Sequence, residues 1–450
     1  MTTKIIPTSY PPAPVGFGES LKYWLKLGFI SFGGPAGQIA MMHLELVERR
    51  RWISERRFLH ALNYCMLLPG PEAQQLATYI GWLMHGVKGG VAAGVLFVLP
   101  SLLLLIALTW VYVSFGSLPV VAGILYGIKP AVTAIVVFAA YRIGTRALRH
   151  GVLWAIAAAA FVAIFALDIP FPYIVLGAAS LGMAGGKFMP DKFKAAGGHG
   201  TSGRDYGAAL IDDDTPTPGH ACFSWARLSG LVIIGLVLWG SVMALLSGQS
   251  TLFTMGGFFT KAALVTFGGA YAVLPYVYQG GVEHYQWLTA HQMIDGLALG
   301  ETTPGPLIMV VAFVGFIGGW SKALFGPDTL FWAGAAGAGV ATFFTFLPSF
   351  LFILAGGPLV ERTHGDLKFT APLTAITAAV VGVILNLAVF FAWHTLWPAA
   401  IKTAPFSGQF EWFSALLGVA AFIVLWRYQA GVVKVIGACA LLGLGYSMLA

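Results

Sequence analysis

The sequence is poor in charge and in cysteine. Charged residues make up 10% of its 450 residues, whereas hydrophobic residues make up 58%. Apolar stretches of roughly 18 to 28 residues recur along most of the chain, and each is long enough to cross the hydrocarbon core of a bilayer as a helix. The composition therefore excludes a water-soluble protein and predicts an all-α polytopic membrane protein.

The scarcity of cysteine excludes several kinds of chemistry. Cys65, Cys222 and Cys439 form no close pair and no metal-type spacing with histidine. The sequence therefore supports neither a disulfide framework nor thiol redox chemistry. A redox enzyme in the membrane would need such ligands. We expect a protein that is not an enzyme and that has no cofactor and no metal site.

Two polar segments lie outside the apolar stretches. Residues 1–17 are rich in proline and lack the apolar core of a cleaved signal peptide, so we expect a short tail. Residues 187–225 mix glycine, proline, serine and both charge signs, as linkers do. The acidic run 212–214 within this linker is typical of a solvated loop rather than of a cation site. We expect no nucleic-acid partner.

The linker separates two halves that repeat each other. At a constant offset of 235, KLGFISFGG of residues 26–34 matches KAALVTFGG of residues 261–269, and Pro-Gly-Pro 69–71 matches Pro-Gly-Pro 304–306. The tripeptide Leu-Pro-Ser recurs at residues 99–101 and 347–349. Such self-similarity indicates an internal duplication. We expect a first repeat over residues 18–186, a connecting transmembrane helix over 226–247 and a second repeat over 248–450.

Charge indicates that the two halves have opposite orientations. The loop of residues 48–57 carries five arginines, whereas its counterpart at 283–292 carries none. Because cytoplasmic loops accumulate lysine and arginine, the first loop belongs inside and the second outside. The halves are therefore expected in inverted topology, an architecture in which secondary transporters place the substrate site near the membrane midplane.

Two membrane models remain for the segments that contain Gly-Gly and Pro-Gly-Pro. If every apolar segment crosses once, the chain has about thirteen spans and the linker lies opposite the arginine loop, which strains the positive-inside rule. We favour the model in which these segments re-enter, because residues 58–68 and 72–85 would form helices of about 16 and 21 Å, too short to span. The segments that then cross are 90–115, 118–142, 152–167, 172–183, 228–246, 331–355, 371–393, 413–428 and 432–449.

Broken helices in hydrocarbon indicate a cavity, because only protein or water can satisfy their free backbone groups. The N-terminal end of a half-helix presents unpaired N–H groups and a partial positive charge, which favour an anion. Pro71 and Pro306 suit the first turn of such a half-helix, and the neighbouring glycines permit close approach of a ligand. The alternative is that the glycines serve only tight helix packing, and the duplication favours the ligand site.

Polar side chains near the breaks are candidate ligands for an oxyanion. Lys26 and Lys261 precede the two Gly-Gly pairs by one to two turns, and a lysine in a membrane segment is costly enough to imply a function. The alternative is that these lysines snorkel to an interface. Ser31 and Thr266 place hydroxyls beside the breaks, although such hydroxyls often bond their own helix.

Two carboxylates flank the Pro-Gly-Pro turns. Glu72 follows the first turn and Glu301 precedes the second. Because a carboxylate near the bilayer centre favours its neutral form, both are candidates for proton coupling; the alternatives are pairing with a lysine or capping a half-helix. The candidate substrate-binding residues are Lys26, Ser31, Phe32, Gly33, Gly34, Gln38, Pro69, Gly70, Pro71, Gln74, Gln75, Lys261, Thr266, Gly268, Gly269, Thr303, Pro304, Gly305 and Pro306.

The segments around the breaks resemble a known family. FGGPAGQIAMMH (32–43) and LLPGPEAQQLATYIGW (67–82), with weaker echoes TFGGAYAVLPY and ETTPGPLIMVVAFVGF in the second half, are similar to the chromate ion transporter family, CHR, in its long two-domain form. The resemblance covers nearly the whole chain. It implies a bacterial inner-membrane protein that exports chromate, driven by the proton motive force, and confers chromate resistance. It also implies functional importance for residues 32–35, 69–75, 267–269 and 304–306.

The two halves depart from each other within these motifs, since Pro35 aligns with Ala270 and Glu72 with Leu307. We therefore expect unequal contributions to the site. Two alternatives in function remain: a sulfate or general oxyanion transporter, because sulfate and chromate are dianions of similar shape, and a facilitative anion channel, which needs no proton carrier. Whether the chain forms a homodimer is also left open by the sequence.

Overall fold

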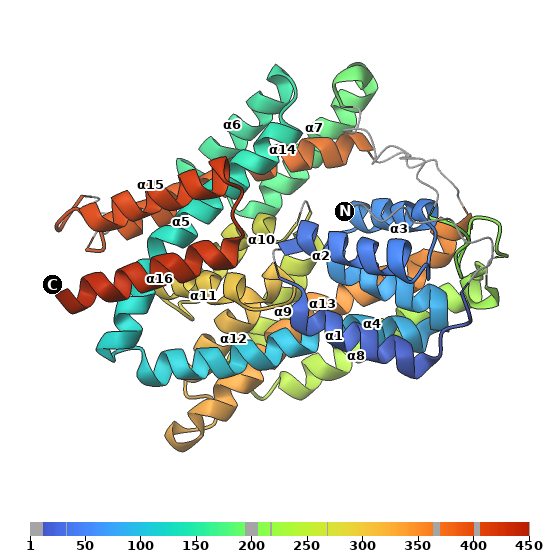
Figure 1. The fold of residues 1–450 in the computed structure, drawn as a ribbon, viewed down its shortest axis with the longest axis horizontal. Coiled ribbons are helices and arrows are strands. Elements are labelled where there is room, and N and C mark those ends of the chain that lie inside the picture. Colours follow the sequence, from blue (N-terminus) through green and yellow to red (C-terminus); the bar gives the residue numbers. More distant parts are fainter. Residues whose placement is uncertain are drawn as a thin grey trace, which may run out of the picture.

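The protein is built from helices. The computed structural model describes residues 12–32, 34–193, 206–216, 218–267, 269–362, 370–399 and 406–449, and within them the only β-type pairing is an isolated bridge between Ile53 and Ile211 (Figure 1). The helices are α1 (Phe17–Ile30), α2 (Gly34–His43), η1 (Leu44–Arg49), α3 (Glu55–Leu67), α4 (Glu72–Phe115), α5 (Pro119–Ala147), α6 (Gly151–Phe165), α7 (Phe171–Phe188), η2 (Pro190–Lys192), η3 (Gly219–Ala221), α8 (Trp225–Leu246), α9 (Ser250–Val265), α10 (Ala270–Tyr278), η4 (Gln279–His284), α11 (Ala290–Thr302), η5 (Leu307–Met309), α12 (Val310–Ser321), η6 (Pro327–Thr329), α13 (Leu330–Arg362), α14 (Thr370–Leu396), α15 (Trp412–Arg427) and α16 (Val432–Leu449).

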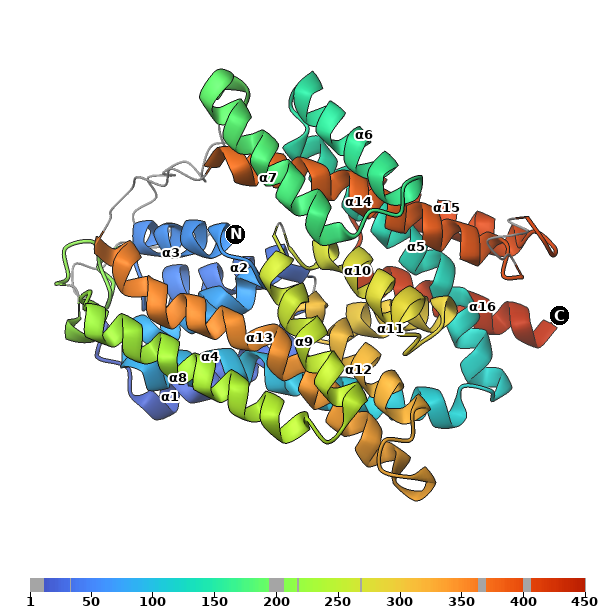
Figure 2. The same ribbon diagram turned by 180° about the vertical axis from the view of Figure 1, so that it is seen from behind.

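Long apolar helices confirm the predicted class of membrane protein. Among the described residues, six helices are long and apolar enough to cross a bilayer: α4, α5, α8, α13, α14 and α16. Each of the nine segments expected to cross corresponds to one helix, the others being α6, α7 and α15; the expected segments 118–142, 152–167 and 413–428 extend beyond α5, α6 and α15 by one or two residues. Figure 2 shows α8 and α13 running side by side along one flank of the molecule.

The internal duplication is visible in the order and length of the helices. At the offset of 235 residues, α1 corresponds to α9, α2 to α10 and α3 to α11. The π-helices η1 (Leu44–Arg49) and η4 (Gln279–His284) correspond residue for residue. Because π-helices are rare in proteins, their recurrence at the same position confirms that the two halves share one architecture.

Each Gly-Gly segment folds back on itself. Arg50, which follows η1, lies beside Glu19 at the start of α1, with 3.3 Å between Nη1 of Arg50 and Oε1 of Glu19. The rings of Tyr23 and Trp52 lie 5.3 Å apart, and in the second half the equivalent rings of Phe258 and Trp287 lie 5.4 Å apart. We call the unit from α1 to η1, and its equivalent from α9 to η4, a Gly-Gly hairpin.

Each Pro-Gly-Pro segment also folds back. α4 bends sharply at His85 and Gly86, so that residues 72–84 pack against residues 87–115, with the backbones of Gly81 and Gly89 in close contact. In the second half, α12 packs in the same way on α13. α3 and α11 have 13 residues each, about 20 Å, which is too short to span a bilayer. We call α3 with residues 72–84, and α11 with α12, Pro-Gly-Pro hairpins; their short helices and their fold-back are what the re-entrant model expects.

The linker is fixed to the arginine loop. Ile53 and Ile211 form the parallel bridge, and the backbone carbonyls of Asp212 and Thr215 accept hydrogen bonds from Arg57 at 3.3 and 3.4 Å. In the expected acidic run, Asp213 accepts from the Ser54 hydroxyl at 2.8 Å. No cluster of acidic, histidine and cysteine side chains suited to a metal occurs in the described parts of the chain. Linker and arginine loop therefore share one side of the protein, as the re-entrant model requires.

Candidate functional site

The tips of the four hairpins meet in two equivalent pairs. The N–H of Gly70, in the first Pro-Gly-Pro turn, donates to the carbonyl of Thr266 in the second Gly-Gly hairpin at 2.8 Å. The N–H of Gly305, in the second turn, donates to the carbonyl of Ser31 in the first hairpin at 2.9 Å. Since Ser31 and Thr266, and likewise Gly70 and Gly305, are equivalent at the offset of 235, the same bond is made twice. Each half thus donates one backbone hydrogen bond to the broken helix of the other half.

Both turns require glycine. Gly70 has φ +123° and Gly305 has φ +107°, conformations that residues with a side chain rarely adopt. A Cβ atom on Gly70 would lie 2.4 Å from Ser349 Oγ, and one on Gly305 would lie 2.6 Å from the Cβ of Ser101. These serines are the two copies of the Leu-Pro-Ser repeat. The repeat therefore supplies, from α4 and α13, the wall against which the opposite turn packs.

Buried amide side chains line the meeting point. Nε2 of Gln38 donates to the carbonyls of Gly305 at 2.5 Å and Ser31 at 3.2 Å, while Nε2 of Gln75 donates to the carbonyl of Pro69 at 2.8 Å. Gln74 bonds Thr78 Oγ1 at 3.0 Å. All three glutamines are fully buried. The sequence prediction that these residues gather at the breaks agrees with their placement.

Several buried polar atoms at this point have no partner. They are Oε1 of Gln38, Gln74 and Gln75 and the hydroxyls of Ser31 and Ser101. An unpaired buried polar atom costs roughly 1 to 3 kcal/mol, so such atoms in a native protein call for a ligand or water. Hydroxyls donate to an oxyanion directly, whereas the glutamine oxygens accept hydrogen bonds and suit water, since the NH2 groups already donate within the protein.

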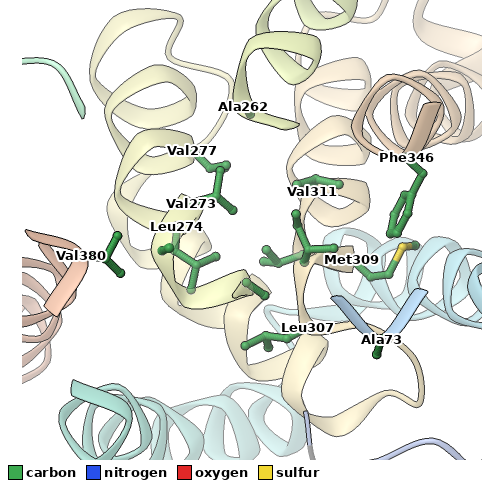
Figure 3. Packing of buried hydrophobic residues seen from close by; sticks show 14 of the residues in the cluster. Ala73, Ala262, Val273, Leu274, Val277, Leu307, Met309, Val311, Phe346 and Val380 are labelled. Atoms are coloured by element: carbon green, nitrogen blue, oxygen red, sulfur yellow. The ribbon is translucent and has the colours of Figure 1, made fainter. Parts of the chain in front are cut away.

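The N-terminal ends of four helices add an electrostatic potential that favours an anion. α2 begins at Gly34, α10 at Ala270 after Gly269, α4 at Glu72 after Pro71, and η5 at Leu307 after Pro306. Free N–H groups at such ends favour negative charge. Buried apolar side chains pack around the tips: Figure 3 shows Ala73, Leu307 and Met309 together with side chains of α9, α10, α13 and α14. Such packing excludes water from the N–H groups at the helix ends.

The two candidate lysines lie elsewhere. Lys26 is exposed on α1, whose buried face is formed by Tyr23, Trp24 and Leu27, and Lys261 is likewise exposed on α9. Helical periodicity places each lysine on the face opposite the tips, so the structure does not bring the expected pair of cations to the site. Phe32 is also exposed.

The hydroxyls of the second half are already bonded. Thr266 Oγ1 donates to the carbonyl of Ala262 at 2.6 Å and Thr303 Oγ1 to that of Gly300 at 3.1 Å, the helix-bonded alternative considered from the sequence. Pro69, Pro304 and the other residues of the two turns lie at the tips. Gly33 and Gly268 lie outside the described residues.

The two candidate carboxylates have different surroundings. Glu72 begins α4 and is partly exposed, with Cys65 as an electrostatic neighbour. Glu301 is buried, accepts a hydrogen bond from the hydroxyl of Tyr271 and interacts electrostatically with Arg142. The two carboxylates therefore differ in burial and in hydrogen bonding.

Sequence reasoning missed two ion pairs that each contain a buried carboxylate. Arg57 on α3 bonds Glu361 on α13, and Lys129 on α5 lies 3.8 Å from Asp295 on α11. The available signal was a lone acidic residue within an apolar segment, which is costly in a membrane and therefore informative. Their cationic partners come from distant segments, so no sequence spacing links them.

Comparison with known proteins agrees with this architecture. The model of the chromate transporter family matches residues 19–183 and 253–444, one segment in each half. The chain belongs to the chromate transporter family. A chromate transport protein of Pseudomonas aeruginosa is 32% identical over 438 residues, covering 97% of this chain and 94% of the relative.

Further chromate transporter relatives match most of the chain. A chromate transport protein of Cupriavidus metallidurans is 31% identical over 379 residues, covering 83% of this chain and 82% of the relative. A probable chromate transport protein of Synechococcus elongatus is 28% identical over 378 residues, covering 83% and 84%. No solved structure matches the chain. The chain is thus a multi-pass membrane protein of a transport family.

Proposed function

We propose that this protein is a secondary active transporter that exports chromate from the cytoplasm, driven by the proton motive force, and so confers chromate resistance. The observation that carries the proposal is the pairing of the hairpin tips, where helix N-terminal ends lie near the buried hydroxyls of Ser31 and Ser101, which have no partner. A tetrahedral dianion matches such a set of donors. Membership of the chromate transporter family names the anion.

The site differs from the one expected from the sequence in its source of positive charge. Because Lys26 and Lys261 are exposed, the attraction comes from backbone N–H groups and helix ends, which act strongly where water is excluded. The arginine loop of residues 48–57 raises the anion concentration near one mouth without selecting among anions.

The two halves are proposed to lie in inverted topology in a bacterial inner membrane. The start of α1 lies near the end of the linker, since Phe17 packs on His85 at 5.5 Å and His220 bonds the carbonyl of Trp82 at 2.8 Å. α8, with 22 residues or about 33 Å, then crosses to the other side, where α9 begins. With the positive-inside rule, the arginine loop and the linker face the cytoplasm.

Transport requires that the site open to one side at a time. The hairpins of the two halves are held at their tips by the two equivalent bonds, Gly70 to Thr266 and Gly305 to Ser31. Rocking of one half against the other about these tips exposes the site in turn to each side. Glu72 and Glu301, which flank the two turns, are the proposed carriers of the coupling proton.

Uptake of labelled chromate and sulfate into proteoliposomes, with and without an imposed pH gradient, tests the proposal. Ser101→Ala removes a buried hydroxyl without breaking a protein hydrogen bond, so we expect a raised KM for chromate. The control is Ser180→Ala, whose hydroxyl bonds its own helix at Leu176. Glu72→Gln is expected to abolish the dependence on the gradient.

Other outcomes would select the alternatives. Equal transport of sulfate and chromate would point to a general oxyanion transporter. Gradient-independent flux in the unmodified protein would point to a facilitative channel. An unchanged KM in Ser101→Ala would remove the hairpin tips as the anion site.

A further inference from the structure

Asp295 is a buried carboxylate whose ion pair is loose. It lies on α11, nine residues before Pro304, in the arm that leads to the second Pro-Gly-Pro turn. Its Oδ2 accepts a hydrogen bond from the hydroxyl of Tyr112 on α4 at 2.9 Å. Its Oδ1 has no hydrogen bond and lies 3.8 Å from Nζ of Lys129 on α5. Three elements, two from the first half and one from the second, therefore meet at one carboxylate.

The other inter-half ion pair shows what a fixed pair looks like. Glu361 contacts Arg57 directly and also accepts from the hydroxyl of Tyr79. Arg57 in turn donates to the backbone carbonyls of Asp212 and Thr215. Both side chains are buried, at 9% and 2% exposure. Removing one partner of such a pair strongly destabilises a protein. We therefore assign the pair of Arg57 and Glu361 a structural role.

The side chain of Lys129, by contrast, can reach water. Its side chain is 27% exposed, whereas that of Asp295 is 5% exposed. A lysine with a partly exposed head reaches water by a change of rotamer. The next residue, Pro130, lies inside α5 and removes a backbone hydrogen bond of that helix. Helix α5 therefore bends most easily next to Lys129, whose positive charge balances that of Asp295.

The other titratable groups near the pair include a tyrosine and two histidines. Tyr112 on α4, Lys129 on α5 and His291, one turn earlier on α11, act electrostatically on Asp295. The ring of His291 lies 6.1 Å from that of His394 on α14. Both histidines are partly exposed. Their bonded ring nitrogens face backbone carbonyls, His291 Nε2 that of Pro398 at 3.2 Å and His394 Nδ1 that of Phe390 at 3.0 Å.

We propose that Asp295 is a proton-binding site of the transport cycle and that Lys129 is the intramolecular cation with which the proton exchanges. The inference rests on the proposed transport function and adds a third carboxylate to Glu72 and Glu301. When α5 and the α11 arm separate, Lys129 moves to water and the isolated buried carboxylate takes up one proton on Oδ1. When Lys129 returns, that proton leaves to water. Charge is thus balanced in both states, which avoids an unpaired buried ion.

The test separates coupling from passage of the anion. Asp295→Asn is reconstituted, and two rates are measured: accumulation of labelled chromate under an imposed pH gradient, and exchange of internal for external chromate without a gradient. We expect accumulation to fall at least tenfold, to the equilibrium level, while exchange continues. Glu411→Gln is the matched control, because Glu411 also accepts a tyrosine hydroxyl, that of Tyr126 on α5, and accumulation there should be unchanged.

A second variant covers loss of folding. If Asp295→Asn leaves Lys129 unpaired and the protein unstable, Asp295→Asn combined with Lys129→Met makes the pair neutral, and exchange without accumulation is again expected. Full accumulation in either variant would overturn the inference, as would loss of exchange in a folded double variant. Absence of gradient-driven accumulation in the unmodified protein would instead contradict the proposed function itself.

Discussion

Replacement of Gly305 by alanine tests whether the Pro-Gly-Pro turns pack too tightly for any side chain. At φ +107° an alanine is strained, at a cost of about 1 to 3 kcal/mol. Its Cβ would also lie 2.6 Å from the Cβ of Ser101, and overpacking of this kind costs roughly 1 to 3 kcal/mol more. The expected loss of stability is therefore about 2 to 6 kcal/mol.

Two other glycines separate the cost of backbone strain from the cost of steric overlap. Gly269 has φ +97° and ψ 174° but open space where a Cβ would be, so Gly269→Ala carries the strain alone, about 1 to 3 kcal/mol. Gly257 lies within helix α9 with open space beside it, so Gly257→Ala should be neutral or stabilising by up to about 1 kcal/mol.

The assay is thermal unfolding of the purified protein in detergent, followed by intrinsic fluorescence. The expected order of Tm is Gly257→Ala highest, then Gly269→Ala, then Gly305→Ala. Adding Ser101→Gly to Gly305→Ala should recover the part due to overlap and leave the part due to strain. Equal Tm for Gly305→Ala and Gly269→Ala would refute the packing argument, and equal Tm for all three would refute the backbone argument as well.

Three further predictions follow from the charged residues. Arg57→Ala leaves the carboxylate of Glu361 buried and unpaired and should cost about 3 to 5 kcal/mol, seen as a lower Tm that the double replacement of both residues by methionine restores; an unchanged Tm would contradict burial of the pair. Lys26→Ala and Lys261→Ala should retain chromate uptake, because both side chains are exposed, and a loss of uptake in proteoliposomes would return these lysines to the site. Glu45, outside the membrane-spanning segments, has its pKa lowered from 4.5 by hydrogen bonding to Arg50. Its contribution to stability is therefore present above pH 4.5 and lost as the pH falls further, so Glu45→Gln should flatten the acid limb of a plot of Tm against pH.

The docked linker shows how local sequence and tertiary structure divide the information. The composition of residues 206–216 indicates a solvated loop, and Asp213 and Asp214 are indeed exposed. Nothing in that segment predicts its parallel bridge to Ile53, because a single backbone pairing depends on where the arginine loop lies in space. The pairing places the linker beside that loop, an arrangement that the re-entrant model expects.

The sequence by itself determined the features that repeat or that follow from hydropathy. Apolar length predicted the crossing helices, the offset of 235 predicted the paired hairpins, and glycine and proline predicted where the helices break. These properties are local, because each depends on the conformational limits of a few neighbouring residues or on the energy of placing one segment in hydrocarbon.

Only the tertiary structure decided which polar groups face the meeting point. Lys26 and Ser31 lie within five residues of each other, yet Lys26 is exposed and the hydroxyl of Ser31 is buried without a partner. The pairs Arg57 with Glu361 and Lys129 with Asp295 join residues 304 and 166 positions apart. Such contacts depend on how the two halves interlock, because the cost of a buried charge is offset only by the partner that packing brings to it.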